Sequence, residues 1–217
     1  MSKMIFTGVL LVAFHWIAAQ QRIDHTFQFI DGAYFSNQQL IKNKPNIEFF
    51  NFKPFGYQLD SKSNLLFFDR NTLQAFENKG IIDSIWTVVV GGKPFIKMGV
   101  DSNAVYFVKY HLIGKVSYFY YPVYTDKPVE MFVHNPYTGD RIGYKTVTNK
   151  QKILIKKILD LSTGEIQDYT QENVLIYLKR DERLRQTLDQ LSEQEVEDKL
   201  FKSLKIYNDR NPIYIKK

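Results

Sequence analysis

Apolar and polar positions alternate through the middle of the chain in a way that favours antiparallel strands. The run Ile85–Val90 is rich in β-branched residues, and Gly91-Gly92 follows it as a two-residue hairpin signal. Pro94 comes two positions after that turn, where its missing N–H would face away from the partner strand. We therefore expect Pro94 to lie on an edge strand, since proline cannot donate to a further strand on that side.

A second hairpin is predicted around Leu112-Ile113-Gly114, taken as a three-residue turn in which Gly114 supplies the left-handed conformation. This register separates apolar from polar side chains better than a two-residue turn would. The face expected to form the core carries Tyr106, Val108, Tyr110, Val116, Tyr118 and Tyr120.

Turn and cap signals divide the rest of the chain. Asn135–Gly139 has Pro at its second position and a closing Gly, which indicates another turn. Ser36, Thr170 and Ser192 are suited to cap helices. Before residue 150 we expect a helix from Ser36 that stops by Lys44 and a helix over Asn71–Lys79. After it we expect a strand over Ile153–Ile158, which turns back at Ser162-Thr163-Gly164, and a helix from Thr170 to about Lys179. Two further helices are expected, one marked by Leu184, Leu188 and Leu191, and one that ends at Asn208 to Pro212 and carries on one face Val196, Leu200, Phe201 and Leu204.

Strands thus dominate residues 20–149, an aromatic-rich region, and helices dominate after a strand and turn in residues 150–217. This order predicts an α+β fold, in which antiparallel β-hairpins form a curved sheet or partial barrel and a helical C-terminal region packs on it. We expect both regions to belong to the same domain, since a chain of 217 residues can bury one large core.

The N-terminal segment differs from everything that follows. Lys3 precedes Ile5–Ala19, a stretch with no formally charged side chain, and the polar residues Gln20 and Gln21 follow it. A basic start, an apolar stretch of about 15 residues and a small-residue exit are typical of a secretory signal peptide, and the stretch is short for a membrane span. The alternative is a buried N-terminal helix. We expect residues 1–19 to be a signal peptide, and the mature protein to be periplasmic or extracellular without a transmembrane segment.

Composition narrows the chemistry. The chain has no cysteine, which excludes disulfides, thiol catalysis and cysteine-bound zinc. Lys and Arg total 29 against 23 Asp and Glu, and the charges are mixed along both regions. A nucleic-acid-binding protein would show a clustered basic stripe, so we expect no nucleic-acid partner. Apolar residues make up 44% of the chain, which argues against a disordered protein.

Residues that could carry catalysis form no recognisable motif. His25, His111 and His134 lack metal-ligand spacing, and each is expected to be a surface or hydrogen-bonded side chain, so no metal or cofactor is predicted. The chain has no nucleophile elbow, phosphate-binding loop or dinucleotide fingerprint. Paired carboxylates stay open, because a sequence does not give the distance between them.

Aromatic residues are the one excess, at 15% of the chain. Tyr118–Tyr121 would place two rings on each face of a strand. Core packing is the simpler explanation, and a ring-lined surface or cavity for a glycan, peptide or apolar ligand is the other. Phe107, Phe119 and Tyr121 are the candidate binding surface, provided that they form an exposed patch.

Several motifs carry a resemblance that covers most of the expected mature chain. Asp31-Gly32-Ala33-Tyr34 followed by Lys42-Asn43-Lys44-Pro45 resembles the opening of a family of uncharacterised secreted proteins from Bacteroidetes-type bacteria. The resemblance implies export and a shared fold, but no activity and no functional residue. Thr87 departs from the Gly expected after Trp86. The other similar blocks are Ile85-Trp86, Gly114–Phe119, Leu159–Ile166 and Tyr207–Pro212.

The sequence therefore favours an exported, non-catalytic binding or envelope-associated protein with an unknown envelope or extracellular partner. Two alternatives are kept. A curved-sheet carrier of an apolar ligand would contain an enclosed apolar cavity. A secreted hydrolase would place two carboxylates opposite each other across a cleft.

Overall fold

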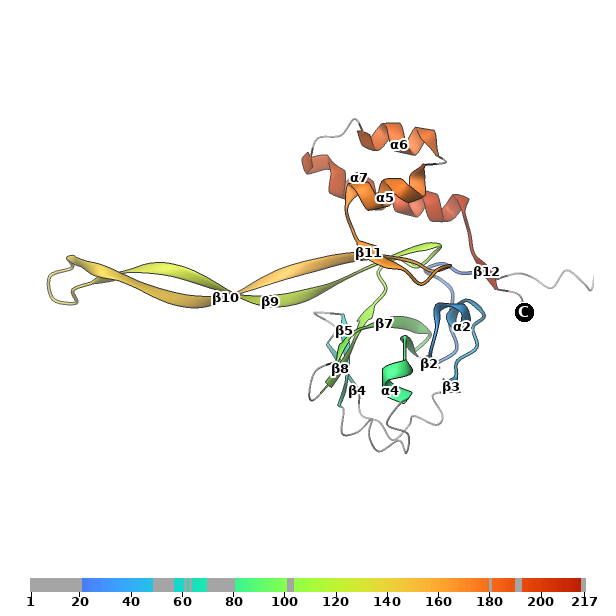
Figure 1. Cartoon of the computed structure of the whole chain (residues 1–217), viewed down its shortest axis with the longest axis horizontal. Helices are drawn as coiled ribbons and strands as arrows, with labels where there is room; N and C mark the ends of the chain where they lie inside the picture. Colours follow the sequence, from blue (N-terminus) through green and yellow to red (C-terminus); the bar gives the residue numbers. More distant parts are fainter. Residues whose placement is uncertain are drawn as a thin grey trace, which may run out of the picture.

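A computed structural model describes residues 21–48, 57–60, 62, 64–69, 81–100, 104–179, 181–189 and 193–215. A curled seven-stranded antiparallel sheet forms a half-barrel, a long two-stranded ribbon projects beside it, and helices lie at the base of the ribbon (Figure 1). This confirms the predicted α+β fold with a curved sheet of antiparallel strands. The predicted signal peptide and the predicted helix over Asn71–Lys79 lie outside the described residues.

The strand order in the large sheet is β3-β2-β6-β7-β8-β5-β4, and the ribbon has the order β11-β10-β9. The strands are β1 (Gln21–Arg22), β2 (Gly32–Tyr34), β3 (Ile47–Glu48), β4 (Tyr57–Asp60), β5 (Leu65–Asp69), β6 (Thr87–Val90), β7 (Lys93–Val100), β8 (Ala104–Lys109), β9 (Val116–His134), β10 (Arg141–Asp160), β11 (Ile166–Asp168) and β12 (Tyr214–Ile215), and the helices are α2 (Asn37–Ile41), α4 (Ile81–Ser84), α5 (Gln171–Leu178), α6 (Glu182–Asp189) and α7 (Glu193–Arg210).

The hairpin predicted at Gly91-Gly92 is confirmed. β6 pairs with β7 so that Val90 lies opposite Lys93, and both glycines have positive φ, as a tight turn between twisted strands requires. The expectation that Pro94 lies on an edge strand is wrong, because β7 lies between β6 and β8. Pro94 is tolerated at the end of the β7–β8 ladder, where its carbonyl oxygen accepts from the Tyr110 amide and its missing N–H costs a single bond.

The hairpin predicted around Leu112-Ile113-Gly114 is wrong. β8 pairs with β5 and β7, whereas β9 pairs with β10. Leu112, a residue of the predicted turn, instead forms an isolated bridge with Tyr118. The predicted register requires the consecutive strands β8 and β9 to pair with each other, and they do not. β8 carries apolar side chains on both faces, so it is stabilised as an interior strand that is covered on both sides.

Three buried clusters follow from this arrangement. The main cluster lies between one face of the large sheet and the base of the ribbon and includes Val108 and Phe119. The second cluster lies on the opposite face of the sheet and includes Phe107. The third cluster joins the ribbon base to α5, α6 and α7 and includes Tyr118 and Leu204. The side chains that we expected to form one core face therefore belong to more than one cluster.

The ribbon is the most extended part of the molecule. β9 and β10 pair from Val116↔Asp160 to Arg141↔His134, and the predicted turn at Asn135–Gly139 closes the hairpin. The base is buried, but side chains from Tyr124 to Leu154 are mostly exposed, and this part projects away from the body (Figure 1). The predicted strand Ile153–Ile158 belongs to β10.

Two of the predicted helix caps lie among the described residues, and the structure confirms both. The Ser36 hydroxyl accepts from the Gln39 amide at the start of α2, and the Thr170 hydroxyl caps α5 in the same way. In the C-terminal helices Leu184, Leu200 and Leu204 are buried. The side chains of Leu188, Leu191, Ser192 and Val196 lie outside the described part. Among the described helices none is both long and apolar enough to cross a membrane.

Candidate functional site

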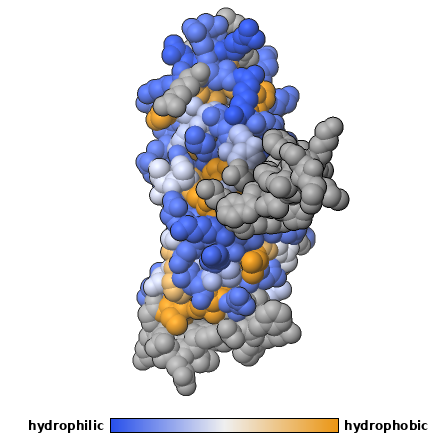
Figure 2. All heavy atoms as spheres, turned by 90° about the vertical axis from the view of Figure 1, so that its right-hand side faces the viewer, coloured by the Kyte–Doolittle hydropathy of each residue, from blue (hydrophilic) through white to orange (hydrophobic). Residues whose placement is uncertain are grey.

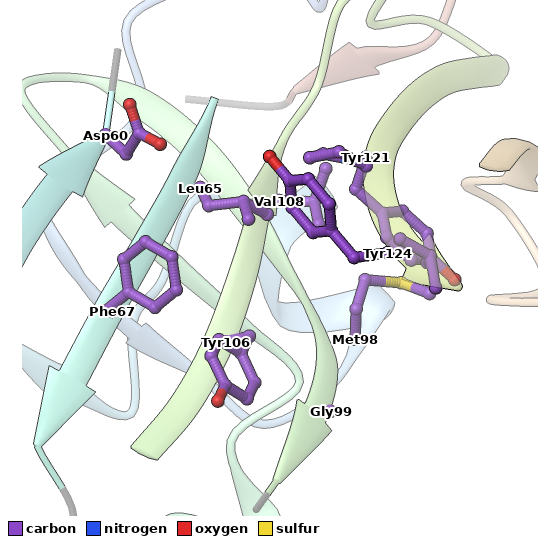
Figure 3. A pocket seen from close by; sticks show the side chains of 11 residues that line it. Asp60, Leu65, Phe67, Met98, Gly99, Tyr106, Val108, Tyr121 and Tyr124 are labelled. Atoms are coloured by element: carbon purple, nitrogen blue, oxygen red, sulfur yellow. The ribbon is translucent and has the colours of Figure 1, made fainter. Parts of the chain in front are cut away.

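An apolar hollow of about 420 Å³ lies where the large sheet meets the base of the ribbon, and we call it the apolar groove. It is open on one side rather than enclosed. Two walls face each other: strands of the sheet form one, and the first half-exposed residues of β9 form the other (Figure 3). The lining residues are Asp60, Leu65, Phe67, Met98, Gly99, Tyr106, Val108, Tyr121, Pro122, Val123 and Tyr124.

The alternation of side chains in the sheet builds the first wall. Leu65 and Phe67 are two apart on β5, as are Tyr106 and Val108 on β8, so each pair points to the same face. Phe67 lies opposite Tyr106 in the ladder, and their rings meet edge to face with centroids 5.3 Å apart. Such contacts hold the rings in place, so the wall is preformed and loses little side-chain entropy when a ligand binds.

Gly99 contributes space to this wall. It follows an irregularity in the β7–β8 register between Lys97 and Gly99. A Cβ atom at Gly99 would lie 3.8 Å from Cδ2 of Tyr106, an ordinary van der Waals contact. A larger side chain at this position would therefore fit the backbone while extending across the Tyr106 ring into the groove.

The predicted surface of Phe107, Phe119 and Tyr121 does not form. Phe107 is 1% exposed in the second cluster, and Phe119 is 0% exposed in the main cluster, on the other side of the sheet. The separation follows from β8 and β9 not being hairpin partners. Tyr121 alone of the three is partly exposed, and it lines the apolar groove.

Two adjoining hollows, together called the histidine cleft, share lining residues and lie between residues 22–29, the β8–β9 connection and α7. The cleft brings His25 and His111 together with Asp24. His111 stacks on Tyr120 with ring centroids 3.8 Å apart, and desolvation of the imidazole lowers the pKa of His111. His134 is far along the ribbon, where its Nδ1 lies 3.0 Å from the carbonyl oxygen of Gly139.

The carboxylates of the histidine cleft are engaged as ion pairs. Asp24 accepts hydrogen bonds from the hydroxyl and the amide of Thr26, and these bonds lower the pKa of Asp24. Arg22 contacts both Asp24 and Asp209. The Thr26 hydrogen bonds and the nearby Arg22 guanidinium favour the ionised form of Asp24, which is the opposite of what a general acid needs. The described residues also contain no group of three or more metal-ligating side chains placed to hold a metal ion.

Sequence reasoning missed most of the groove. Leu65 and Phe67 belong to a strand that is not among the predicted elements, although the run Leu65–Phe68 is the kind of short apolar stretch that predicts a buried strand. Met98 lies on the second strand of the predicted Gly91-Gly92 hairpin, but nothing local marks it as part of a hollow. The alternation on β8 does separate Tyr106 from Phe107. The position of β9, a strand of the ribbon sheet, decides which face of β8 lines the groove.

Comparisons with protein-family models, with curated proteins and with solved structures gave no match for this chain. The resemblance to secreted Bacteroidetes-type proteins thus stays a prediction based on the motifs.

Proposed function

We propose that this is an exported, non-catalytic binding protein whose apolar groove holds an aromatic or aliphatic group of its ligand. The observation that carries the proposal is the groove itself, a preformed hollow lined mainly by apolar and aromatic side chains with a few polar groups at its rim. Ligand sites of about 300–1,000 Å³ typically have this composition. Export rests on the signal-peptide pattern of residues 1–19.

The open side of the groove favours a binding site over a carrier lumen. A carrier is expected to surround its ligand, whereas this hollow can take part of a larger molecule while the rest stays in solvent. The carboxylates of the histidine cleft support a hydrolase less well, because Arg22 pairs with both. The groove therefore supports the binding function best.

The groove can be tested by filling it. In Gly99→Leu, the new side chain should occupy the space beside Tyr106 without backbone strain. We expect the affinity for the apolar fluorescent probe N-phenyl-1-naphthylamine to fall by about tenfold, which corresponds to about 1.4 kcal/mol of lost apolar contact. Probe fluorescence titrated against purified protein measures this.

Gly143→Leu is the matched control. Gly143 lies on the ribbon with nothing near its Cβ position, so the same increase in apolar surface occurs away from the groove. Equal probe affinity in the wild type and Gly99→Leu, or an equal loss in both variants, would show that the probe binds elsewhere and would contradict the proposal.

A further inference from the structure

The projecting part of the ribbon has two outer edges that no described strand covers. β11 pairs with β10 only at the base, opposite Lys157, Ile158 and Leu159. Beyond that point the edge of β10 continues to the tip of the ribbon (Figure 1). An exposed strand edge presents a row of N–H and C=O groups that can pair with another chain.

The hydrogen bonds at the base fix which residues of β10 present these groups. Lys156 accepts from the Tyr169 amide through its carbonyl oxygen, and the Asp160 amide donates to Glu165. Even-numbered residues therefore direct their peptide groups away from β9, and the alternation holds along the continuous register. The outward donors are Tyr144, Thr146, Thr148, Lys150, Lys152 and Leu154.

The two edges of the ribbon differ in their ability to pair. β9 contains Pro122 and Pro128, which lie opposite Leu154 and Thr148. These pairs belong to the set whose peptide groups point outward, so both missing N–H groups fall on the outer edge of β9. Proline at such positions is a common protection against edge pairing. β10 has no proline between Arg141 and Asp160, so its row of donors is unbroken.

The charge of the β10 edge indicates what would pair with it. Lys150 and Lys152 are exposed and lie two apart, so they share one face of the ribbon. On the same face of β9, Asp126 lies opposite Lys150 and Glu130 lies opposite Thr146, and these carboxylates offset part of this charge. β10 itself carries no acidic residue from Arg141 to Leu154. At the base, β11 shows how the edge is complemented: the Asp168 carboxylate lies 2.7 Å from the Lys157 ammonium as their residues pair.

We propose that the outer edge of β10, from Tyr144 to Leu154, binds an extended acidic segment of a partner polypeptide as an added strand that continues the ladder begun by β11. Backbone hydrogen bonds supply affinity, as in other cases of strand addition. Acidic side chains at alternate positions, opposite Lys150 and Lys152, supply specificity. The segment spans about 11 residues, at about 3.3 Å per residue. This site is separate from the apolar groove and does not depend on it.

The probe is a synthetic 12-residue peptide of alternating Glu and Thr, titrated into ¹⁵N-labelled protein at low salt. Binding should slow hydrogen exchange at the even-numbered amides of β10 and leave the amides of β9 unchanged. The same peptide with Lys in place of Glu should bind at least about tenfold more weakly, and salt should weaken binding of the acidic peptide.

Two proline variants test the edge itself. Thr148→Pro removes an outward donor of β10 without breaking a β9–β10 bond, and Glu130→Pro does the same on β9. Peptide binding should be lost in Thr148→Pro and kept in Glu130→Pro. Lys150→Glu with Lys152→Glu tests the charge and should reverse the preference between the two peptides.

Several results would overturn the proposal. They are no binding at millimolar acidic peptide, equal binding to Thr148→Pro, or equal affinity for the basic peptide. Concentration-dependent self-association that Thr148→Pro abolishes would also overturn it, because the edge would then pair with a second copy.

Discussion

At the residue scale, the motif Asp31-Gly32-Ala33-Tyr34 is explained by structure rather than by chemistry. The Asp31 carboxylate accepts from the amides of Gly91 and Gly92 at 3.0 and 2.7 Å, and so it caps the β6–β7 turn. The Tyr34 hydroxyl donates to the Ile30 carbonyl at 2.7 Å. Burial raises the pKa of Tyr34, so the phenol stays protonated and keeps this bond. The side chains of Asp31 and Tyr34 thus fix the β6–β7 turn and the segment that leads into β2.

Gly32 is required by close packing, which gives a first prediction. A Cβ atom there would lie 2.4 Å from the carbonyl oxygen of Ile47, a backbone atom that cannot move aside independently. Gly32→Ala should therefore lower the free energy of unfolding by about 2–3 kcal/mol, through strain at the β2–β3 pair. Chemical denaturation measures the change. Gly143→Ala, with open space at its Cβ, is the control, and equal effects of both would contradict the steric explanation.

At the element scale, a few buried polar contacts dock the C-terminal helix against the ribbon. Asn208 of α7 is 5% exposed, and its side chain accepts from the Val116 amide and donates to the Val116 carbonyl at 2.9 and 2.8 Å. Gly114 lies directly beneath the Asn208 side chain, where a Cβ atom would be 2.5 Å from Cγ. Two of the sequence blocks named in the first subsection, Gly114–Phe119 and Tyr207–Pro212, therefore meet at this contact.

Replacing Asn208 should loosen the helix from the ribbon. Asn208→Ala leaves both backbone groups of Val116 without their side-chain partner in a buried position, so we expect a loss of about 2–4 kcal/mol in unfolding free energy. Chemical denaturation monitored by circular dichroism measures it. Asn149→Ala, on the exposed part of the ribbon, should change stability by less than about 0.5 kcal/mol. A similarly small loss in Asn208→Ala would show that water replaces the two bonds.

At the scale of the whole molecule, polar and apolar surfaces are unevenly placed. Figure 2 shows blue surface interrupted by scattered orange areas on one side of the body. The ribbon instead carries exposed apolar side chains far from any core, including Met131, Phe132, Ile142 and Tyr144. An isolated two-stranded ribbon is marginally stable in water, and the strand addition proposed for β10 would supply a third strand.

Shortening the ribbon should separate its role from that of the body. Removing 126–150 and joining Thr125 to Gln151 through Asn-Gly closes a two-residue turn between residues that already form a hydrogen-bonded pair of the ladder. We expect the unfolding free energy to change by less than about 1 kcal/mol, since the removed side chains are mostly exposed. Probe binding in the groove should persist, and binding of the acidic peptide should be lost. Thermal unfolding and the two titrations measure this, and an unfolded or insoluble product would contradict the view that the body folds alone.

Local signals in the sequence determined the turns, the caps and the α+β class. The Gly91-Gly92 hairpin, the Asn135–Gly139 turn and the caps at Ser36 and Thr170 all depend on residues within a few positions of one another. Their physical causes, a permitted positive φ or a hydroxyl near free amides, act within one turn of chain. They could be predicted without knowing the rest of the molecule.

Only the tertiary structure decided which strands pair and therefore where a site can lie. Alternation along β8 is compatible with either partner, and pairing with β5 and β7 instead of β9 buried Phe107 and Phe119 on opposite sides of the sheet. The apolar groove forms because residues of β9, a strand of the ribbon, lie opposite strands of the large sheet. The free edge of β10 exists because β11 ends after three paired residues. Strand pairing between distant segments is set by the burial of whole faces, and no short stretch of sequence contains that information.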